Sequence, residues 1–311
     1  MKFSTKVSIG NYDSKIFYRD KIISLGSCFS DEIGAKLAGY RFQILVNPFG
    51  VIYNPASIAS SLERLVSGRE FTEKDIIEDG GIYKSYFHSS IYAEYSLEAL
   101  LKKINESLSL ASRHFHESGW VMVTLGTRWI YKLKSTGVVV SNCHKIPQSQ
   151  FQREALNVEE IYSLLSPLIE SFPDKKWLFT VSPIRHWKDG AHENQLSKAT
   201  LLLSVEKLQN SYENVLYFPA YEILMDELRD YRYYGEDMLH PSSLAVDYIW
   251  EQFSEALISE TEFEVMDMVG KLNIMRSHRP IFPQSDSFKK FEMECSHIEA
   301  VVKKMLEEKY L

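Results

Sequence analysis

Residues 21–27 read KIISLGS, a short apolar run rich in β-branched residues that ends at a Gly-Ser pair. Three later runs have the same character: WVMVTLGT at 120–127, KWLFTVSP at 176–183 and NVLYFPA at 214–220. Apolar runs of this length, bounded by turn residues, are typical of strands buried on both faces of a parallel sheet. RFQILVNPFG at 41–50 predicts one more strand, and we expect it at an edge because Pro48 ends it.

Segments with helical periodicity lie between these strands. They are PASIASSLERLVSG (55–68), SLEALLKKINESLSLASRHF (96–115), NVEEIYSLLSPLIESF (157–172) and ENQLSKATLLLSVEKLQN (193–210). Strands that alternate with helices predict the α/β class, with helices on both faces of a parallel sheet. The expected fold is therefore a flavodoxin-like three-layer α/β/α sandwich.

Two regions fall outside this alternation. WIYKLKSTGVVVSNCHK at 129–145 predicts an inserted hairpin, with Ser-Thr-Gly at its turn. From about Thr261 onward the chain is helical, with a proline-interrupted break in HRPIFPQ at 278–284 before an amphipathic last helix. We expect one domain over residues 1–260, and a C-terminal helical extension over 261–311 that packs on this domain or at a homodimer interface.

Composition narrows the class of partner. The chain has 35 Lys and Arg against 42 Asp and Glu, a net charge of −7, and its cations are mixed with acids. This disfavours nucleic acid as a partner, because binding a phosphate backbone requires a basic surface. No apolar stretch approaches the roughly 20 residues that span a bilayer, and the N-terminus lacks a secretory h-region. We expect a cytoplasmic protein with no membrane partner, whose three scattered cysteines stay reduced.

Polar residues follow several predicted strands, at the edge where ligands bind in open parallel sheets. Ser27 ends the first strand, and Asp237 and His240 come after the last one, just before Pro241-Ser242-Ser243, which predicts a helix start. A carboxylate can hold an imidazole by Nδ1–H while Nε2 serves as the base for a hydroxyl. Ser27 is the candidate hydroxyl. The alternative is a Gly-Ser turn without chemistry and a helix-entry acid beside a packed or surface histidine.

These residues resemble a known group of enzymes. Gly26-Ser27 after the first strand, with Asp237-Met238-Leu239-His240 late in the chain, is similar to the SGNH (GDSL-like) hydrolase superfamily. More narrowly, GSCFS at 26–30 matches the motif that names the GSCFA family of bacterial proteins. Other stretches resemble that family as well, namely NPFGVIYNP (47–55), LGTRWIY (125–131), SNCHKIP (141–147), SPIRHWKDGAHENQLSKATLL (182–202) and YFPAYEILMDELRDYRYYGEDMLHP (217–241).

The resemblance implies roles for three residues. Ser27 would be the nucleophile, His240 the general base and Asp237 the acid that orients the imidazole. It also implies the SGNH hydrolase fold. The backbone N–H that follows the first strand, and that of Gly50 after the second, are the implied donors of an oxyanion hole.

One position departs from the superfamily pattern. SGNH enzymes carry Gly-x-Asn after the third strand, whereas this chain has Gly126-Thr127-Arg128, so the asparagine donor is missing. Losing one oxyanion donor costs about 10²–10³ in rate. Arg128 and Asn142 of the predicted hairpin are two candidates for a replacement.

Neighbouring residues have competing interpretations. Cys28 is intrinsically a better nucleophile than serine, but consecutive residues point in different directions, and we expect it to pack under the turn. Cys143 and His144 could join Cys28 and His240 as zinc ligands. Adjacent strand residues face opposite sides, so we expect no metal and place His144 or Lys145 at the substrate instead.

Arg185 and His186 follow the fourth strand and are further candidates for the substrate site. A cation near a helix N-terminus suits a carboxylate or phosphate on a ligand. The alternative for Arg185 is a structural ion pair with Asp189 or Glu193.

The sequence therefore predicts an esterase or acyl hydrolase that needs no cofactor. Its expected substrate is a small-molecule or carbohydrate ester, such as an O-acetyl sugar, by analogy with the superfamily alone. Three alternatives stay open: an O-acyltransferase that uses the same residues, a non-catalytic binding protein that has lost the oxyanion asparagine, and a metal-dependent enzyme built on Cys143, His144 and His240.

Overall fold

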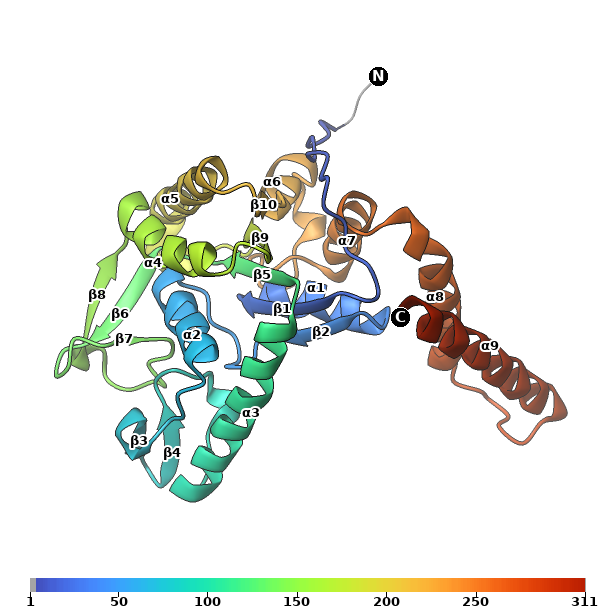
Figure 1. Ribbon diagram of the computed structural model, residues 1–311, viewed down its shortest axis with the longest axis horizontal. Helices are drawn as coiled ribbons and strands as arrows, with labels where there is room; N and C mark the ends of the chain where they lie inside the picture. The colour runs from blue at the N-terminus through green and yellow to red at the C-terminus, as the bar shows by residue number, and fades with distance from the viewer. Residues whose placement is uncertain (1–3, 311) are drawn as a thin grey trace.

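A five-stranded parallel sheet forms the centre of the protein, whose computed structural model describes residues 4–310 (Figure 1). In spatial order the strands are β2 (Gln43–Val46), β1 (Lys21–Gly26), β5 (Trp120–Leu125), β9 (Lys176–Val181) and β10 (Val215–Tyr217). This order confirms the predicted flavodoxin-like arrangement. The chain leaves β1 toward one edge and returns at β5 toward the other, which makes the carboxyl ends of β1 and β5 the switch point where such folds bind ligands.

Successive side chains along each strand point to opposite faces of the sheet, and each face has its own hydrophobic core. Ile23, Val123 and Phe179 face one core, while their neighbours Ile22, Met122 and Leu178 face the other. Because both faces are covered, the strands are continuous apolar runs and do not alternate with polar residues.

Helices cover both cores and complete the three-layer α/β/α sandwich. The first core is closed by α2 (Pro55–Ser67), α3 (Leu97–Glu117), α4 (Val158–Ser171) and α5 (Gly190–Ser211). The second core is closed by α1 (Cys28–Gly39), α7 (Ser243–Leu257) and the segment around α6 (Ala220–Glu222), which continues into a short π-helix over Ile223–Glu227. Ser242 caps α7, as its position before the helix predicted.

Two small antiparallel sheets lie beside the sandwich (Figure 1). One pairs β3 (Ile76–Asp79) with β4 (Ile82–Ser85), and the other has the order β7 (Val139–Val140), β6 (Trp129–Leu133), β8 (Phe151–Ala155). The predicted hairpin therefore forms, but its second strand ends at Val140 and not at residue 145. The chain turns there because the N–H groups of Ser141 and Asn142 donate to the carbonyl of Tyr86.

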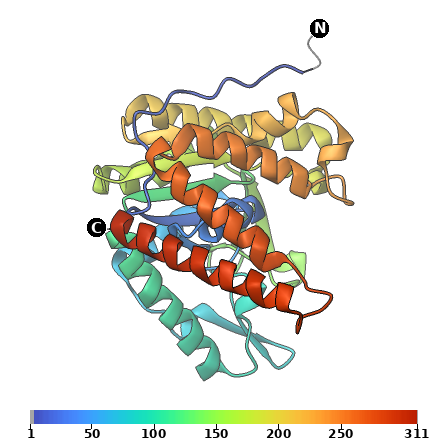
Figure 2. The same ribbon diagram turned by 90° about the vertical axis from the view of Figure 1, so that its right-hand side faces the viewer.

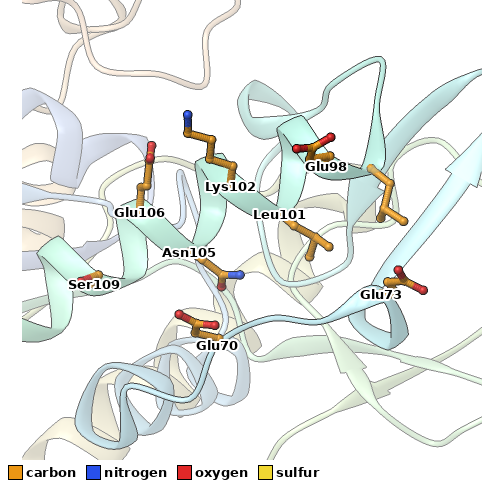
Figure 3. Close-up of a pocket in the computed structure, with 9 residues that line it drawn as sticks. Glu70, Glu73, Glu98, Leu101, Lys102, Asn105, Glu106 and Ser109 are labelled. Atoms are coloured by element: carbon orange, nitrogen blue, oxygen red, sulfur yellow. The ribbon is translucent and has the colours of Figure 1, made fainter.

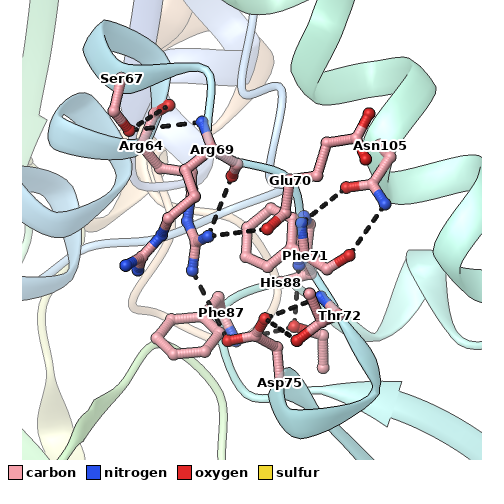
Figure 4. A network of polar contacts seen from close by, with 11 residues as sticks. Arg64, Ser67, Arg69, Glu70, Phe71, Thr72, Asp75, Phe87, His88 and Asn105 are labelled. Atoms are coloured by element: carbon pink, nitrogen blue, oxygen red, sulfur yellow. Dashed lines mark hydrogen bonds and ion pairs between the residues drawn. The ribbon is translucent and has the colours of Figure 1, made fainter.

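Arg64 stabilises the loop that connects α2 to β3 through hydrogen bonds and an ion pair (Figure 4). Its guanidinium donates to the carbonyls of Arg69 and Glu70, at 2.9 and 3.2 Å, and lies over the ring of Phe71. Nearby His88 is only 1% exposed among aromatic rings, and burial lowers its pKa to about 3. His88 is therefore neutral at physiological pH, and its Nδ1 is hydrogen-bonded to Ser85 Oγ at 3.0 Å.

The C-terminal helices α8 (Phe263–Ser277) and α9 (Asp286–Tyr310) lie side by side, against the second core (Figure 2). Val269 and Leu272 of α8 and Val302 of α9 are buried with residues of α1 and α7. The break between the two helices contains the predicted prolines. A domain boundary near residue 260 and a dimer interface stay predictions. Among residues 4–310, no helix combines the length and the apolar character that crossing a membrane requires.

Candidate functional site

Three loops meet at the carboxyl edge of the sheet and are joined by hydrogen bonds. After β1, Ser27 Oγ donates to Ser182 Oγ, which follows β9, over 2.9 Å. Arg185 lies in the same loop as Ser182 and donates through its guanidinium to the carbonyl of Met238, in the loop before α7. The structure thus gathers at one edge the polar segments that their positions after the strands predicted.

Ser27 lies at the junction of β1 and α1. It is the N-cap of α1, its Oγ accepts the N–H of Phe29 at 3.3 Å, and it is 4% exposed. Gly26 before it has a φ of 153°, and a Cβ at that position would lie 2.5 Å from the carbonyl oxygen of Thr124 on β5. Only glycine lets β1 and β5 approach this closely, so the sheet itself positions the Ser27 hydroxyl at the switch point.

Asp237 and His240 form an oriented pair in the loop before α7. Asp237 Oδ2 lies 2.5 Å from His240 Nδ1, and its Oδ1 accepts the N–H groups of His240 and Leu239, both at 2.9 Å. These three donors, with the backbone N–H of His240 contributing most, hold the pKa of the Asp237 carboxyl well below its usual range. The pair leaves His240 Nε2 directed away from its carboxylate, as a general base requires.

The pair is about half-exposed, with side-chain exposures of 48% for Asp237 and 50% for His240. Met238 between them has a φ of 59°, a left-handed conformation that is uncommon outside glycine. Within residues 4–310, no hydrogen bond joins His240 to Ser27, because the Ser27 hydroxyl donates to Ser182. Catalytic hydrogen bonds of this kind often form only in the substrate complex.

The backbone donors expected around the serine are mostly engaged within the protein. The N–H of Gly50 donates to the carbonyl of Asn47 at 2.7 Å, and that of Gly126 donates to the carbonyl of Tyr53 at 2.7 Å. The N–H of Ser27 itself donates to Thr124. In the described part of the chain, the N–H of Cys28 has no acceptor, since it opens the first turn of α1.

Neither predicted replacement for the missing asparagine is directed at Ser27. Arg128 extends along α5, where it donates to Thr200 Oγ1 at 3.2 Å and pairs with Glu193 at 3.7 Å. The side chain of Thr127 also faces α5 and contacts Ser197 Oγ at 3.1 Å. Asn142 accepts the N–H of His144 at 2.8 Å and so shapes its own loop.

Arg185 and His186 lie at the site, but not in the ion pairs considered for Arg185. Asp189 pairs with Arg153, and Glu193 pairs with Arg128. The ring of His186 lies 5.4 Å from that of Tyr53, and its Nε2 would be 3.2 Å from a Cβ at Gly126. Burial, aided by the nearby charge of Lys198, lowers the pKa of His186 to about 4, so the imidazole is neutral at physiological pH.

The structure also shows the surroundings of Cys28 and His144, two residues with competing predictions. Cys28 is exposed and does not pack under the turn, which corrects that prediction, because it opens α1 on the solvent side. Crowding by protein atoms and the nearby Asp31 raise the pKa of its thiol, which keeps the thiolate fraction low. His144 is buried, with Nε2 2.7 Å from the carbonyl of Ser85, and a contact between His144 and substrate stays a prediction. Within residues 4–310, no three His, Cys, Asp or Glu side chains are grouped as metal ligands.

Two residues at the site were not singled out from the sequence. Ser182 accepts the Ser27 hydroxyl, and Lys198 of α5 is fully buried behind it. Lys198 Nζ donates to the carbonyls of Gly126 at 2.8 Å and of Ser182 at 2.7 Å. Lys198 therefore clamps together the loops that follow β5 and β9. The local signal was the small residue Ser197 before it, which is buried against Thr127, whereas Ala199 after it is exposed.

Lys198 gives the stability of the protein a specific pH dependence. Burial lowers its pKa from 10.5 to about 7, and its neutral amine has two N–H donors for the two carbonyls. Between these values the unfolded chain holds a proton that the folded chain has released, so stability rises with pH by about 1.4 kcal/mol per unit. From pH 7.5 to 9.0, urea unfolding should show a gain of about 2 kcal/mol that Lys198→Met lacks. Equal pH dependence in both proteins would contradict this assignment.

A separate hollow of about 580 Å³ runs along α3 (Figure 3). Its walls carry the carboxylates of Glu70, Glu73, Glu98 and Glu106. The side chain of Asn105, which also lines the hollow, is already hydrogen-bonded to the backbone of Phe71. Its Oδ1 accepts the Phe71 N–H and its Nδ2 donates to the Phe71 carbonyl. This hollow contains none of the loops that converge on Ser27, so it is not part of the candidate site.

Comparison with known protein families identifies the family of the chain. The model of the GSCFA family matches residues 21–253, from the start of β1 into α7, and so spans Ser27, Asp237 and His240. No curated protein matches the chain. Because the match covers most of the chain and the whole five-stranded sheet, the protein belongs to the GSCFA family.

Proposed function

We propose that the protein is a serine hydrolase of ester bonds, with Ser27 as nucleophile, His240 as general base and Asp237 as the residue that orients His240. The observation that carries this proposal is the Asp237–His240 pair, which fixes the imidazole through Nδ1. Its loop is tied through Arg185 to the loop that holds the Ser27 hydroxyl. The likeness to SGNH hydrolases supports the same reading, and small O-acyl groups on carbohydrates are the substrate class that it favours.

The proposed reaction has two balanced steps. Ser27 Oγ bonds to the ester carbonyl carbon while its proton passes to His240 Nε2, and the same proton then leaves with the alcohol as the C–O bond breaks. Water repeats this sequence on the acyl-enzyme and releases the acid. An acceptor hydroxyl in place of water would make the protein an O-acyltransferase. For either reaction, the Ser27 hydroxyl must turn from Ser182 toward His240.

Two donors stand in for the usual oxyanion hole in this proposal. The N–H of Cys28 opens α1, where the helix dipole favours negative charge. His186, neutral and beside Gly126, supplies a side-chain N–H near the position of the missing asparagine. A neutral imidazole donates through one ring nitrogen only, so this role needs the proton on Nε2.

Labelling by a fluorophosphonate probe tests the proposal directly. The probe transfers its phosphonyl group to an activated serine and loses fluoride. We expect a labelled band for the wild type and for Cys28→Ala, and none for Ser27→Ala. Absence of labelling in folded wild-type protein would favour a non-catalytic binding protein, and labelling that survives in Ser27→Ala would rule out Ser27 as the nucleophile.

A further inference from the structure

A cavity distinct from the hollow along α3 lies next to the candidate site around Ser27, and Tyr53 borders both. It has a volume of about 260 Å³ and lies between Tyr53 and the loop that follows β7. Tyr53 is the shared wall, because its carbonyl accepts the N–H groups of Gly126 and Thr127, and its ring contacts His186. A ligand in this cavity would therefore sit one side chain away from the loops around Ser27.

The lining of the cavity is aromatic and cationic. Trp129, Tyr131 and Tyr53 contribute rings, and Lys145 and Lys188 contribute the charges, with no Asp or Glu among the lining residues. Neither lysine forms an ion pair within residues 4–310. In a chain with a net charge of −7, a carboxylate-free cavity with two unpaired lysines would attract an anionic ligand.

The loop that carries Lys145 is held in a strained conformation. His144 and Lys145 have φ values of 49° and 64°, so two consecutive residues other than glycine are left-handed. Each such residue costs on the order of 1–3 kcal/mol and persists only when its surroundings enforce it. Three hydrogen bonds hold His144 in this conformation: its Nε2–H donates to the carbonyl of Ser85, its Nδ1 accepts the hydroxyl of Ser90, and its backbone N–H donates to Asn142 Oδ1. These contacts fix the backbone position of Lys145 at the rim of the cavity.

Trp129 contributes an aromatic surface to the cavity. Its indole N–H is buried and has no acceptor in the described residues, so a ligand would contact the ring and not this donor. The guanidinium of Arg153 lies 3.9 Å from the centroid of the Trp129 ring and helps to hold the ring in place. Aromatic faces bind the apolar face of a sugar ring.

We propose that this cavity binds a single sugar ring that carries a negatively charged group, with the charge at Lys145 and Lys188 and the ring against Tyr53 and Trp129. This inference rests on the proposed function, for which it names the alcohol part of the ester. At about 260 Å³, the cavity is smaller than the roughly 300–1,000 Å³ that drug-sized ligands occupy. It accommodates one ring, and not a nucleotide cofactor or an acyl-CoA.

Binding can be measured without turnover in the Ser27→Ala variant. Titration calorimetry with glucuronate and with glucose 6-phosphate should detect binding that weakens as salt is raised, because the contacts are ionic. Glucose, the neutral control, should bind at least about tenfold more weakly. The two anionic sugars separate a carboxylate from a phosphate as the preferred group. Glucose that binds as tightly as both, or no binding by either anion, would overturn the inference.

Variants of the two lysines test the site itself. Lys145→Asn removes the charge with a residue that tolerates the left-handed conformation, and Lys188→Gln removes the other charge at an exposed position. Each should weaken binding of the anionic sugars about five- to tenfold, which corresponds to roughly 1.0–1.4 kcal/mol. Lys134→Gln, at the exposed turn after β6 and outside the cavity, is the matched control and should bind as before. Unchanged affinity in both cavity variants would refute the assignment.

The two proposals fail separately. Hydrolysis of p-nitrophenyl acetate, a neutral ester without a sugar, reports on Ser27 alone. Its absence together with intact sugar binding would refute the hydrolase and leave the cavity assignment standing. Intact hydrolysis with no binding of the charged sugars would refute the cavity assignment and leave the hydrolase proposal standing.

Discussion

Ser27→Ala should lower kcat/KM for p-nitrophenyl acetate by at least about 10³-fold, because alanine leaves no atom to form the acyl-enzyme. The substitution also removes the N-cap of α1, where Ser27 Oγ accepts the N–H of Phe29. Loss of such a cap costs roughly 1 kcal/mol of stability, which is too little to unfold a domain of this size. Steady-state kinetics on folded protein, checked by thermal unfolding, therefore separates the chemical effect from the structural one.

Cys28→Ala is the matched control for Ser27→Ala. The Cys28 side chain is exposed, and its raised pKa leaves little thiolate at neutral pH, so this variant should keep most of the activity. The N–H that we assign to the oxyanion hole is a backbone group and survives the change. Equal losses in the two variants, or activity that survives Ser27→Ala, would end the serine mechanism.

Asp237→Asn should lower kcat by about 10⁴-fold with little effect on folding. Asparagine keeps an oxygen for the N–H groups of Leu239 and His240, so the loop retains its shape. Its amide N–H₂ would face His240 Nδ1, which must then act as an acceptor and carry its proton on Nε2. An imidazole in that tautomer cannot take the proton of Ser27.

Asp230→Asn provides the same chemical change outside the site. Asp230 also accepts a backbone N–H through Oδ1, that of Arg232 at 2.9 Å, and pairs with the Arg232 side chain through Oδ2. It should leave kcat unchanged. If Asp237→Asn retained more than about a tenth of the wild-type kcat, Asp237 would not have the orienting role assigned to it in the triad.

The sheet was predictable because its strands are buried on both faces. Ile22 and Ile23 enter different cores, so the sequence of β1 shows an unbroken apolar run with clear ends. The small sheets were harder to predict for the opposite reason. β8 has the sequence FQREA and β3 has IIED, and both are partly exposed, so packing imposes no continuous apolar pattern on them.

Those parts of the candidate site that depend on local sequence were predictable. A glycine beside a strand end and an aspartate three residues from a histidine are short-range patterns, which the sequence shows directly. Lys198 is different, because a lysine in a helix ordinarily indicates a solvated face. Its burial follows from two carbonyls on distant loops, those of Gly126 and Ser182, which only the folded chain brings together. The left-handed Lys145 likewise depends on contacts from β4 and the segment after it.

The close packing of Gly26 on Thr124 affects how the family motif should be interpreted in other chains. Glycine is required there by the distance between two strands, and Ser27 by the cap of a helix, so selection for folding alone would retain both residues. The His240 side chain is half-exposed and, among the described residues, bonds only to Asp237, so a chain that had no use for this imidazole could replace it at little cost in stability. In related sequences, the late Asp-x-x-His is therefore the better marker of an enzyme, and the Gly-Ser pair is a marker of the fold.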